Sequence, residues 1–105
     1  MTLVVRYHPE AVAELRAEVA WYEARGAGLG DRFAGAVDDM VDTVLEWPES
    51  GAMWPGWVSI PVVRSRRVGG FPFRLVYLVQ PAELVVVAVA HDKRLPGYWR
   101  ERVSE

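Results

Sequence analysis

The chain has 105 residues, of which 51% are hydrophobic, a formal net charge of −2 and no cysteine. This length and composition suffice for one compact domain, expected over residues 1–105, with a core of its own. The composition excludes disulfides and thiolate metal ligands, and no stretch matches a signal peptide or the roughly 20 apolar residues of a membrane span. We therefore expect a soluble cytoplasmic protein without membrane contact.

Charge is divided unevenly along the chain. Residues 1–57 carry four arginines against ten acidic residues, whereas residues 58–105 carry eight basic residues against four acidic ones. The negative net charge argues against non-specific nucleic-acid binding through an overall positive field. An acidic partner or a polyanion is therefore expected to meet the C-terminal half.

The N-terminal half predicts one strand and two helices. Residues 3–8, LVVRYH, are a β-branched run typical of a strand, and Pro9 suits the first turn of a helix. Apolar residues then recur every three or four positions over residues 9–28 and again over residues 29–48. A short glycine-containing link between these segments predicts an antiparallel helix hairpin, which closes at Pro48.

The C-terminal half predicts a loop over residues 49–57 and then three strands. Residues 58–68 contain Pro61, which indicates an edge position or a bulge. Residues 71–79 follow a glycine turn, and residues 84–91, LVVVAVAH, are apolar on both faces, which indicates a central strand covered on both sides. The predicted fold is α+β: an N-terminal strand, an antiparallel two-helix hairpin and a three-stranded antiparallel meander, with one sheet against the helices.

Metal and cofactor motifs are not found. The histidines are His8 and His91, and no grouping of His, Asp and Glu has the spacing of a metal site. The segment GLGDRF does not follow a predicted strand, so it does not match a phosphate-binding glycine loop. We expect neither a metal ion nor an organic cofactor.

Four segments carry a family resemblance in their order along the chain: WYE, then GLGDRF, then FPFRLVY, then HDKRLPGYW. Together they resemble the RelE/ParE superfamily of toxins from bacterial type II toxin–antitoxin systems, and the ParE-like members more than the RelE-like ones. The resemblance implies the fold that the periodicity predicts independently. It also implies a partner, a small DNA-binding antitoxin that forms a hetero-oligomeric complex with the chain.

The resemblance leaves three activities open. ParE-like members inhibit DNA gyrase without a known hydrolytic reaction, whereas RelE-like members cleave mRNA on the ribosome. A third alternative is a non-toxic protein of the same fold that only forms a regulatory complex with its partner. Fold does not choose among them, because function is carried by the site. RelE-like sites are rich in lysine and this chain has only Lys93, so we favour a gyrase inhibitor that is not an enzyme.

The endoribonuclease alternative names four candidate catalytic residues. Attack of a 2′-hydroxyl on its phosphate requires a base, cations that stabilise the phosphorane, and an acid. The resemblance places Arg74 at an arginine of the RelE-like site, and Arg94 and Tyr98 near a second arginine and a C-terminal tyrosine. His91 is the residue type most suited to act as a base near neutral pH, although a hydrogen bond to the following turn is the commoner role of such a histidine. Tyr98 and Trp99 equally suit anchors of the C-terminal segment.

Five basic residues form the candidate partner-binding surface: Arg64, Arg66, Arg74, Lys93 and Arg94. Arg64 and Arg66 alternate onto one face of their predicted strand, where they also suit an edge protected against aggregation. Arg74 suits either an acidic antitoxin segment or the covering of apolar surface by its stem. Because the hairpin covers only one sheet face, we expect the other face to keep apolar surface for an antitoxin segment that folds as it binds.

Overall fold

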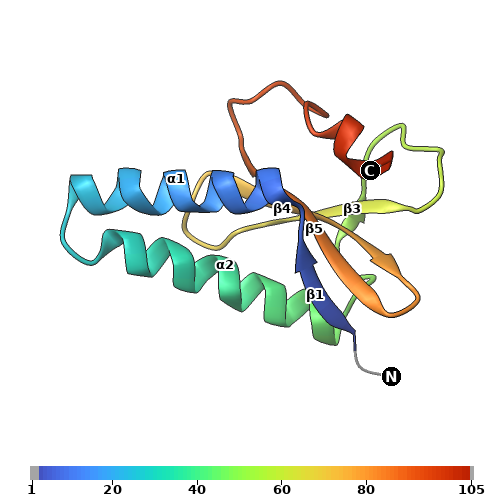
Figure 1. Cartoon of the computed structure of the whole chain (residues 1–105), viewed down its shortest axis with the longest axis horizontal. Coiled ribbons are helices and arrows are strands. Elements are labelled where there is room, and N and C mark those ends of the chain that lie inside the picture. The colour runs from blue at the N-terminus through green and yellow to red at the C-terminus, as the bar shows by residue number, and fades with distance from the viewer. Residues whose placement is uncertain (1–2, 105) are drawn as a thin grey trace.

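The computed structural model describes residues 3–104. Its elements are β1 (Val4–Tyr7), α1 (Pro9–Arg25), α2 (Leu29–Glu46), β2 (Ala52–Met53), β3 (Val63–Arg67), β4 (Phe73–Gln80), β5 (Glu83–His91) and the 3₁₀ helix η1 (Arg100–Ser104). The strands form a five-stranded sheet in the order β1-β5-β4-β3-β2, in which β1 runs parallel to β5 and the other pairs are antiparallel. The two helices lie side by side along one side of this sheet (Figure 1). The predicted α+β class and element order are confirmed.

The helix hairpin is closed by a carboxylate and a glycine. Glu23, near the end of α1, accepts hydrogen bonds from the backbone N–H groups of Gly28 and Gly30, at 3.1 and 3.0 Å. Gly30 lies so close to α1 that an added Cβ would stand 2.7 Å from the carbonyl oxygen of Val19. The hairpin therefore requires glycine at this position, because any side chain would push the two helices apart.

The sheet separates two apolar clusters. The hairpin-side cluster contains Phe33 of α2 against Phe73 and Leu75 of β4, with the Phe33 and Phe73 ring centroids 4.9 Å apart. The opposite cluster, here called the tryptophan cluster, covers the second sheet face with Trp54, Trp57 and Trp99. The ring of Trp99 lies 5.0 Å from that of Trp54 and 5.8 Å from that of Trp57.

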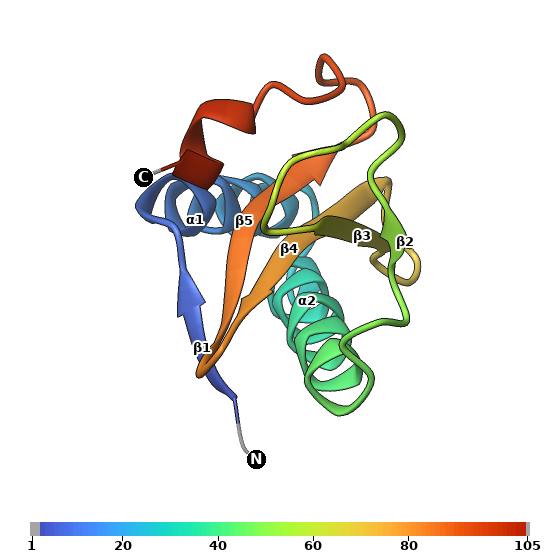
Figure 2. The same cartoon turned by 90° about the vertical axis from the view of Figure 1, so that its right-hand side faces the viewer.

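The central position of β5 is confirmed. Every residue from 84 to 89 is at most 5% exposed, because β5 has a strand on either side and an apolar cluster on each face. The chain after β5 then crosses to η1, which lies beside the first turns of α1 (Figure 2). The chain itself thus covers much of the second sheet face, so the apolar surface expected there for a partner is confined to what the tryptophan cluster leaves open.

Two strand predictions are also wrong. Residues 58–62 are not part of β3, which begins at Val63, and Pro61 lies in the preceding loop with a cis peptide bond to Ile60. Proline has no N–H for the ladder, so the strand begins after it. β3 is not an edge either, because β2, within the predicted loop, pairs Ala52 with Ser65. A strand of two residues is too short to leave a periodic pattern in the sequence.

Candidate partner-binding site

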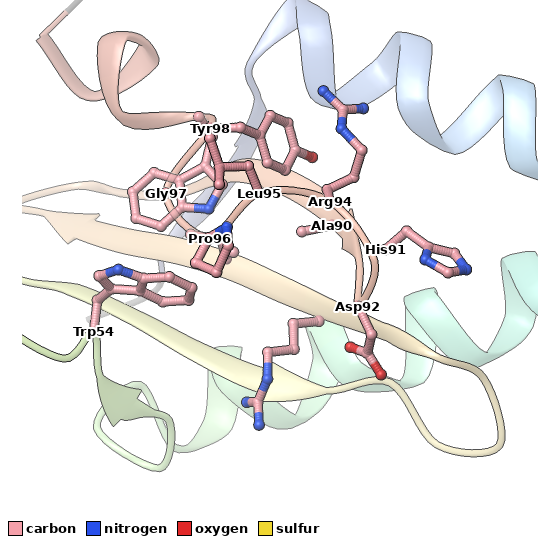
Figure 3. Close-up of a pocket in the computed structure, with 12 residues that line it drawn as sticks. Trp54, Ala90, His91, Asp92, Arg94, Leu95, Pro96, Gly97 and Tyr98 are labelled. Atoms are coloured by element: carbon pink, nitrogen blue, oxygen red, sulfur yellow. The ribbon is translucent and has the colours of Figure 1, made fainter.

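A trough opens on the second face of the sheet, at the side of β4. Two adjoining hollows of about 150 and 460 Å³ share Trp54, Arg74 and Pro96 in their walls. In Figure 3 the ring of Trp54 lies at one end of the smaller hollow and Pro96 lies above it. We call this the Arg74 trough and define it by Met53, Trp54, Ser65, Arg74, Pro96 and Arg100.

Arg74 reaches the trough because of its register in β4. Arg74 pairs with Ala90 on one side and with Arg67 on the other. Its side chain therefore projects from the sheet face that carries the tryptophan cluster. Arg74 is half-buried, and Nη1 donates only a long hydrogen bond of 3.4 Å to the hydroxyl of Ser65. Arg67 is neutralised by Asp92 at 2.9 Å, whereas no carboxylate among residues 3–104 lies within 4.0 Å of Arg74.

Arg100 is a second guanidinium at the same trough. Gly97 adopts φ 78°, and a Cβ added there would stand 2.9 Å from Cζ of Arg100, so glycine allows Arg100 to fold back beneath the turn. In the part of the chain that the structure describes, Arg100 has no carboxylate within ion-pair distance. Two guanidiniums without counter-ions beside apolar walls are suited to bind carboxylates of a partner.

Tyr98 and Arg102 are bound to Glu14 of α1. The Tyr98 hydroxyl donates to Oε2 of Glu14 at 2.5 Å, and the guanidinium of Arg102 donates to both oxygens of Glu14, at 3.0 and 2.9 Å. Burial, and then the hydrogen bond to Glu14, raise the pKa of Tyr98 far above its ordinary value of 10.0. Burial acts to lower the pKa of Arg102, but the hydrogen bond and charge of Glu14 outweigh it, so this pKa is raised as well. Tyr98 therefore stays protonated and engaged.

His91 and Arg94 do not face Arg74. His91 pairs with Phe73, whose ring it meets edge-on at 4.8 Å on the hairpin side, and Figure 3 shows its ring pointing away from Trp54. Nδ1 of His91 accepts a hydrogen bond from the backbone N–H of Lys93 at 3.0 Å, which is the turn-holding alternative. The Arg94 guanidinium stacks on the Tyr98 ring, 3.9 Å from its centroid. The four candidate catalytic residues line one hollow, but three of them have other partners: His91 contacts Phe73 and the following turn, Arg94 stacks on Tyr98, and Tyr98 donates to Glu14.

The five predicted partner-binding residues do not form one surface: three are divided between the two faces of the sheet, and two lie after β5. Arg64 pairs with Tyr77 and Arg66 pairs with Leu75. Both side chains therefore project from the hairpin side of the sheet, which is the face opposite to that of Arg74. Arg64 donates to the carbonyl oxygen of Gly51 at 2.9 Å and thereby holds the chain after α2. Lys93 and Arg94 are exposed in the segment after β5.

Four residues at or beside the site are not predicted from the sequence: Glu14, Trp54, Arg100 and Arg102. Arg100 and Arg102 belong to the basic C-terminal half, which is a weak signal for a binding role. Glu14 gave no signal, because its partners Tyr98 and Arg102 lie 84 and 88 residues away. Within residues 3–104, no group of three or more His, Asp and Glu residues is placed to hold a metal ion, and no helix has the length and apolarity needed to cross a membrane.

Two solved structures of toxin–antitoxin proteins share the fold of this chain. The chain shares its fold with a protein of the chromosomal ParDE toxin–antitoxin system of P. aeruginosa, at 22% identity and a TM-score of 0.57, over 86% of this chain and 96% of that one. It also shares it with a mutant of E. coli toxin RelE in the free state, at 19% identity and a TM-score of 0.58, over 100% of this chain and 94% of that one. The fold is that of the RelE/ParE superfamily, as predicted.

Sequence similarity then gives the family. The family described as ParE toxin of type II toxin–antitoxin system, parDE, matches residues 5–96, and the chain belongs to this family. The prediction that the chain is closer to ParE than to RelE is confirmed. No curated protein gives a significant match.

Proposed function

We propose that this ParE-family chain is a toxin that binds and inhibits DNA gyrase and is neutralised by a small DNA-binding antitoxin in a hetero-oligomeric complex. The observation that carries the proposal is the Arg74 trough, whose guanidiniums have no carboxylate of residues 3–104 within ion-pair distance and lie between apolar walls. Such a surface is suited to a protein segment with acidic and apolar side chains, which matches inhibition by binding.

The arrangement of the polar groups supports binding over RNA cleavage. A general acid must be free to give its proton, but the Tyr98 hydroxyl is held by Glu14. A base must lie near the nucleophile, but the ring of His91 projects from the hairpin side of the sheet, whereas Arg74 projects from the other side. Arg74 and Arg94 meet the requirement for cations at an accessible hollow, and a free acid and a nearby base are what the arrangement lacks.

The endoribonuclease alternative retains two supporting observations. The fold is shared with RelE, and Arg74, His91, Arg94 and Tyr98 all contribute to the walls of the smaller hollow. An RNA substrate would have to reorient these groups, since catalytic hydrogen bonds often tighten only in the substrate complex. The non-toxic regulatory alternative requires only the partner-binding surface.

Pulse labelling of DNA and protein synthesis separates the three activities. The chain is induced without antitoxin, and both rates are followed during the first minutes. Gyrase inhibition predicts that DNA synthesis falls first. An earlier fall in protein synthesis would replace our proposal with the endoribonuclease, and undisturbed growth at equal expression would support the regulatory protein.

Substitution of Arg74 tests the trough. We expect Arg74→Ala to weaken binding of the co-expressed antitoxin by roughly tenfold or more, because a carboxylate of the partner would lose its guanidinium. Arg66→Ala is the matched control, since Arg66 is on the neighbouring strand but on the opposite face. Dissociation constants are measured by calorimetry. Equal losses in the two variants would mean that general positive charge, rather than the trough, binds the partner.

The same variant separates binding from cleavage in cells. The endoribonuclease alternative requires Arg74 for phosphorane stabilisation, so Arg74→Ala would abolish toxicity under that alternative. Full toxicity of Arg74→Ala without antitoxin would therefore exclude it.

A further inference from the structure

Strand β5 continues beyond the end of its neighbour β1. The β1–β5 register ends at the pair Tyr7 and Val86, whereas β5 runs on to His91. On its other side, β5 is interrupted by a bulge, because Val76 pairs with Ala88 while the next residue of β4 pairs with Val86. Val87 is thus left without a strand partner, and on the side that β1 no longer covers, the backbone of residues 87–89 requires hydrogen bonds from elsewhere.

Two side chains provide these hydrogen bonds. Arg102 donates from Nη1 to the carbonyl oxygen of Val87 at 3.1 Å, and Glu14 accepts at Oε1 from the backbone N–H of Val89 at 3.1 Å. The two side chains are themselves joined by a two-pronged ion pair in which they are only 12% and 15% exposed. Glu14 and Arg102 therefore take the place of β1 along the last part of β5.

The same carboxylate orients the segment that forms the wall of the Arg74 trough. Tyr98 donates its hydroxyl to Glu14, and the ring of Tyr98 then carries the guanidinium of Arg94 at 3.9 Å. Directly after Tyr98, Trp99 is only 1% exposed within the tryptophan cluster, and Arg100 lines the trough. One side chain of α1 thus sets the positions of Tyr98 and Arg102, on either side of Trp99 and Arg100.

We propose that Glu14 is a positioning residue for the partner-binding site: it holds Arg94 and Arg100 in place through Tyr98 and Arg102 without itself lying in the trough. The inference rests on the proposed function where partner binding is measured. A glutamate is required because four donors converge on it, from Tyr98, from Val89 and two from Arg102. A glutamine would present an N–H₂ group to those donors and leave at least one without an acceptor.

The test compares Glu14→Gln with two control variants of the full chain. Glu18→Gln removes the same charge one helical turn further along α1, and the Glu18 side chain makes no hydrogen bond with other residues of the described range. Val37→Ala opens a cavity in the hairpin-side cluster and serves as a control for lost stability. Thermal unfolding of each variant is measured first, so that binding is compared where all of them are folded.

The first readout is independent of any partner. In ¹⁵N-labelled protein, we expect Glu14→Gln to shift the side-chain N–H signals of Arg94 and Arg100 and the backbone amide signal of Val89. Val37→Ala should leave both arginine signals unchanged, and Glu18→Gln, which alters a hollow lined by Arg94, should leave the signals of Arg100 and Val89 unchanged. Unshifted arginine signals in Glu14→Gln would overturn the proposal, because Glu14 would then only stabilise the fold.

The second readout is the dissociation rate of the protein encoded beside this chain's gene, used as the antitoxin. We expect Glu14→Gln to raise it by roughly tenfold while both controls stay close to the unmodified chain, since changes at an interface act mostly on dissociation. An unchanged rate would overturn the positioning role and leave the proposed function intact. Absence of binding by the unmodified chain would instead refute the antitoxin proposal, and the arginine signals alone would then decide the role of Glu14.

If Glu14→Gln does not fold, Tyr98→Phe takes its place. This variant removes a single hydrogen bond to Glu14 and keeps the ion pair with Arg102. We expect the Arg94 signal to shift from its position in the unmodified chain and the dissociation rate to rise by less than tenfold. If neither the Arg94 signal nor the dissociation rate changes, the proposal is overturned.

Discussion

At the residue scale, the pKa of Tyr98 depends on its burial and on the carboxylate of Glu14 that accepts its hydrogen bond. Its hydroxyl is held by a carboxylate, so loss of its proton would place two negative charges against each other. Burial, then the hydrogen bond to Glu14 and the charge of Glu14, raise the pKa of Tyr98 in the folded chain above the ordinary value of 10.0, which the unfolded chain has. A pKa that is higher in the folded state contributes stability that is fully present below pH 10 and is lost as pH rises further.

This gives a prediction for the alkaline range. The free energy of unfolding of the unmodified chain should exceed that of Tyr98→Phe by a constant amount below pH 10, on the order of 1 kcal/mol for one hydrogen bond. Above that pH the difference should shrink, because unfolding then releases the Tyr98 proton. Urea unfolding at a series of pH values measures it. A difference that instead grows with pH below 10 would show that the pKa of Tyr98 is lowered, not raised, in the folded chain.

At the scale of elements, the helix hairpin depends on the close approach of α2 to α1. An added Cβ at Gly30 would stand 2.7 Å from a backbone oxygen of α1, while at Gly35, also in α2, nothing lies within 4 Å of it. The two glycines therefore provide opposite tests within one helix.

We expect Gly30→Ala and Gly35→Ala to change stability in opposite directions. Gly30→Ala should lower the free energy of unfolding by about 1–3 kcal/mol, because backbone cannot move aside easily. Gly35→Ala should raise it by about 0.5–1 kcal/mol, since alanine favours the helix and the site is exposed. Calorimetric melting temperatures check both signs, and stabilisation by Gly30→Ala would contradict the described hairpin packing.

The remaining elements show what a short C-terminal segment does for a sheet. η1 has five residues and would not be stable alone, yet Arg102 ties it to β5 and α1 while Trp99 fills the second sheet face. The tryptophan cluster therefore replaces a second layer of helices on that face. What remains open is the trough beside Trp54, where Arg74 lies.

At the scale of the whole molecule, charge is separated between the two layers. The exposed outer side of α2 carries Asp38, Asp39, Asp42 and Glu46, whereas the trough carries Arg74 and Arg100. An acidic segment is thus attracted to one side of the molecule and repelled by the other. This polarity orients an approaching partner before contact.

Ionic strength should therefore act on association. We expect the association rate with the co-expressed antitoxin to fall as salt is raised, because the Debye length shortens from about 10 Å at 0.1 M salt. Arg74→Ala should reduce the slope of this dependence, and Arg66→Ala should do so less. Stopped-flow measurements at several salt concentrations check the prediction. A rate independent of salt would mean that apolar contacts alone guide the partner.

The sequence by itself determined the hairpin, the central strand and the family. Residues 84–91 are apolar on both faces and the two helices have periodic stripes, and local patterns of this kind depend only on neighbours in the chain. Arg74 is a candidate site residue through its place in the FPFRLVY segment, and its face follows from strand alternation.

Only the tertiary structure decided which polar groups meet. Strand pairing sends Arg64 and Arg66 to one face and Arg74 to the other, and the bulge at Val87 creates the places that Glu14 and Arg102 fill. These contacts join residues more than 70 positions apart or depend on the register of neighbouring strands. Such contacts arise from the packing of whole elements, and packing leaves no periodic trace in the sequence around any one of the residues.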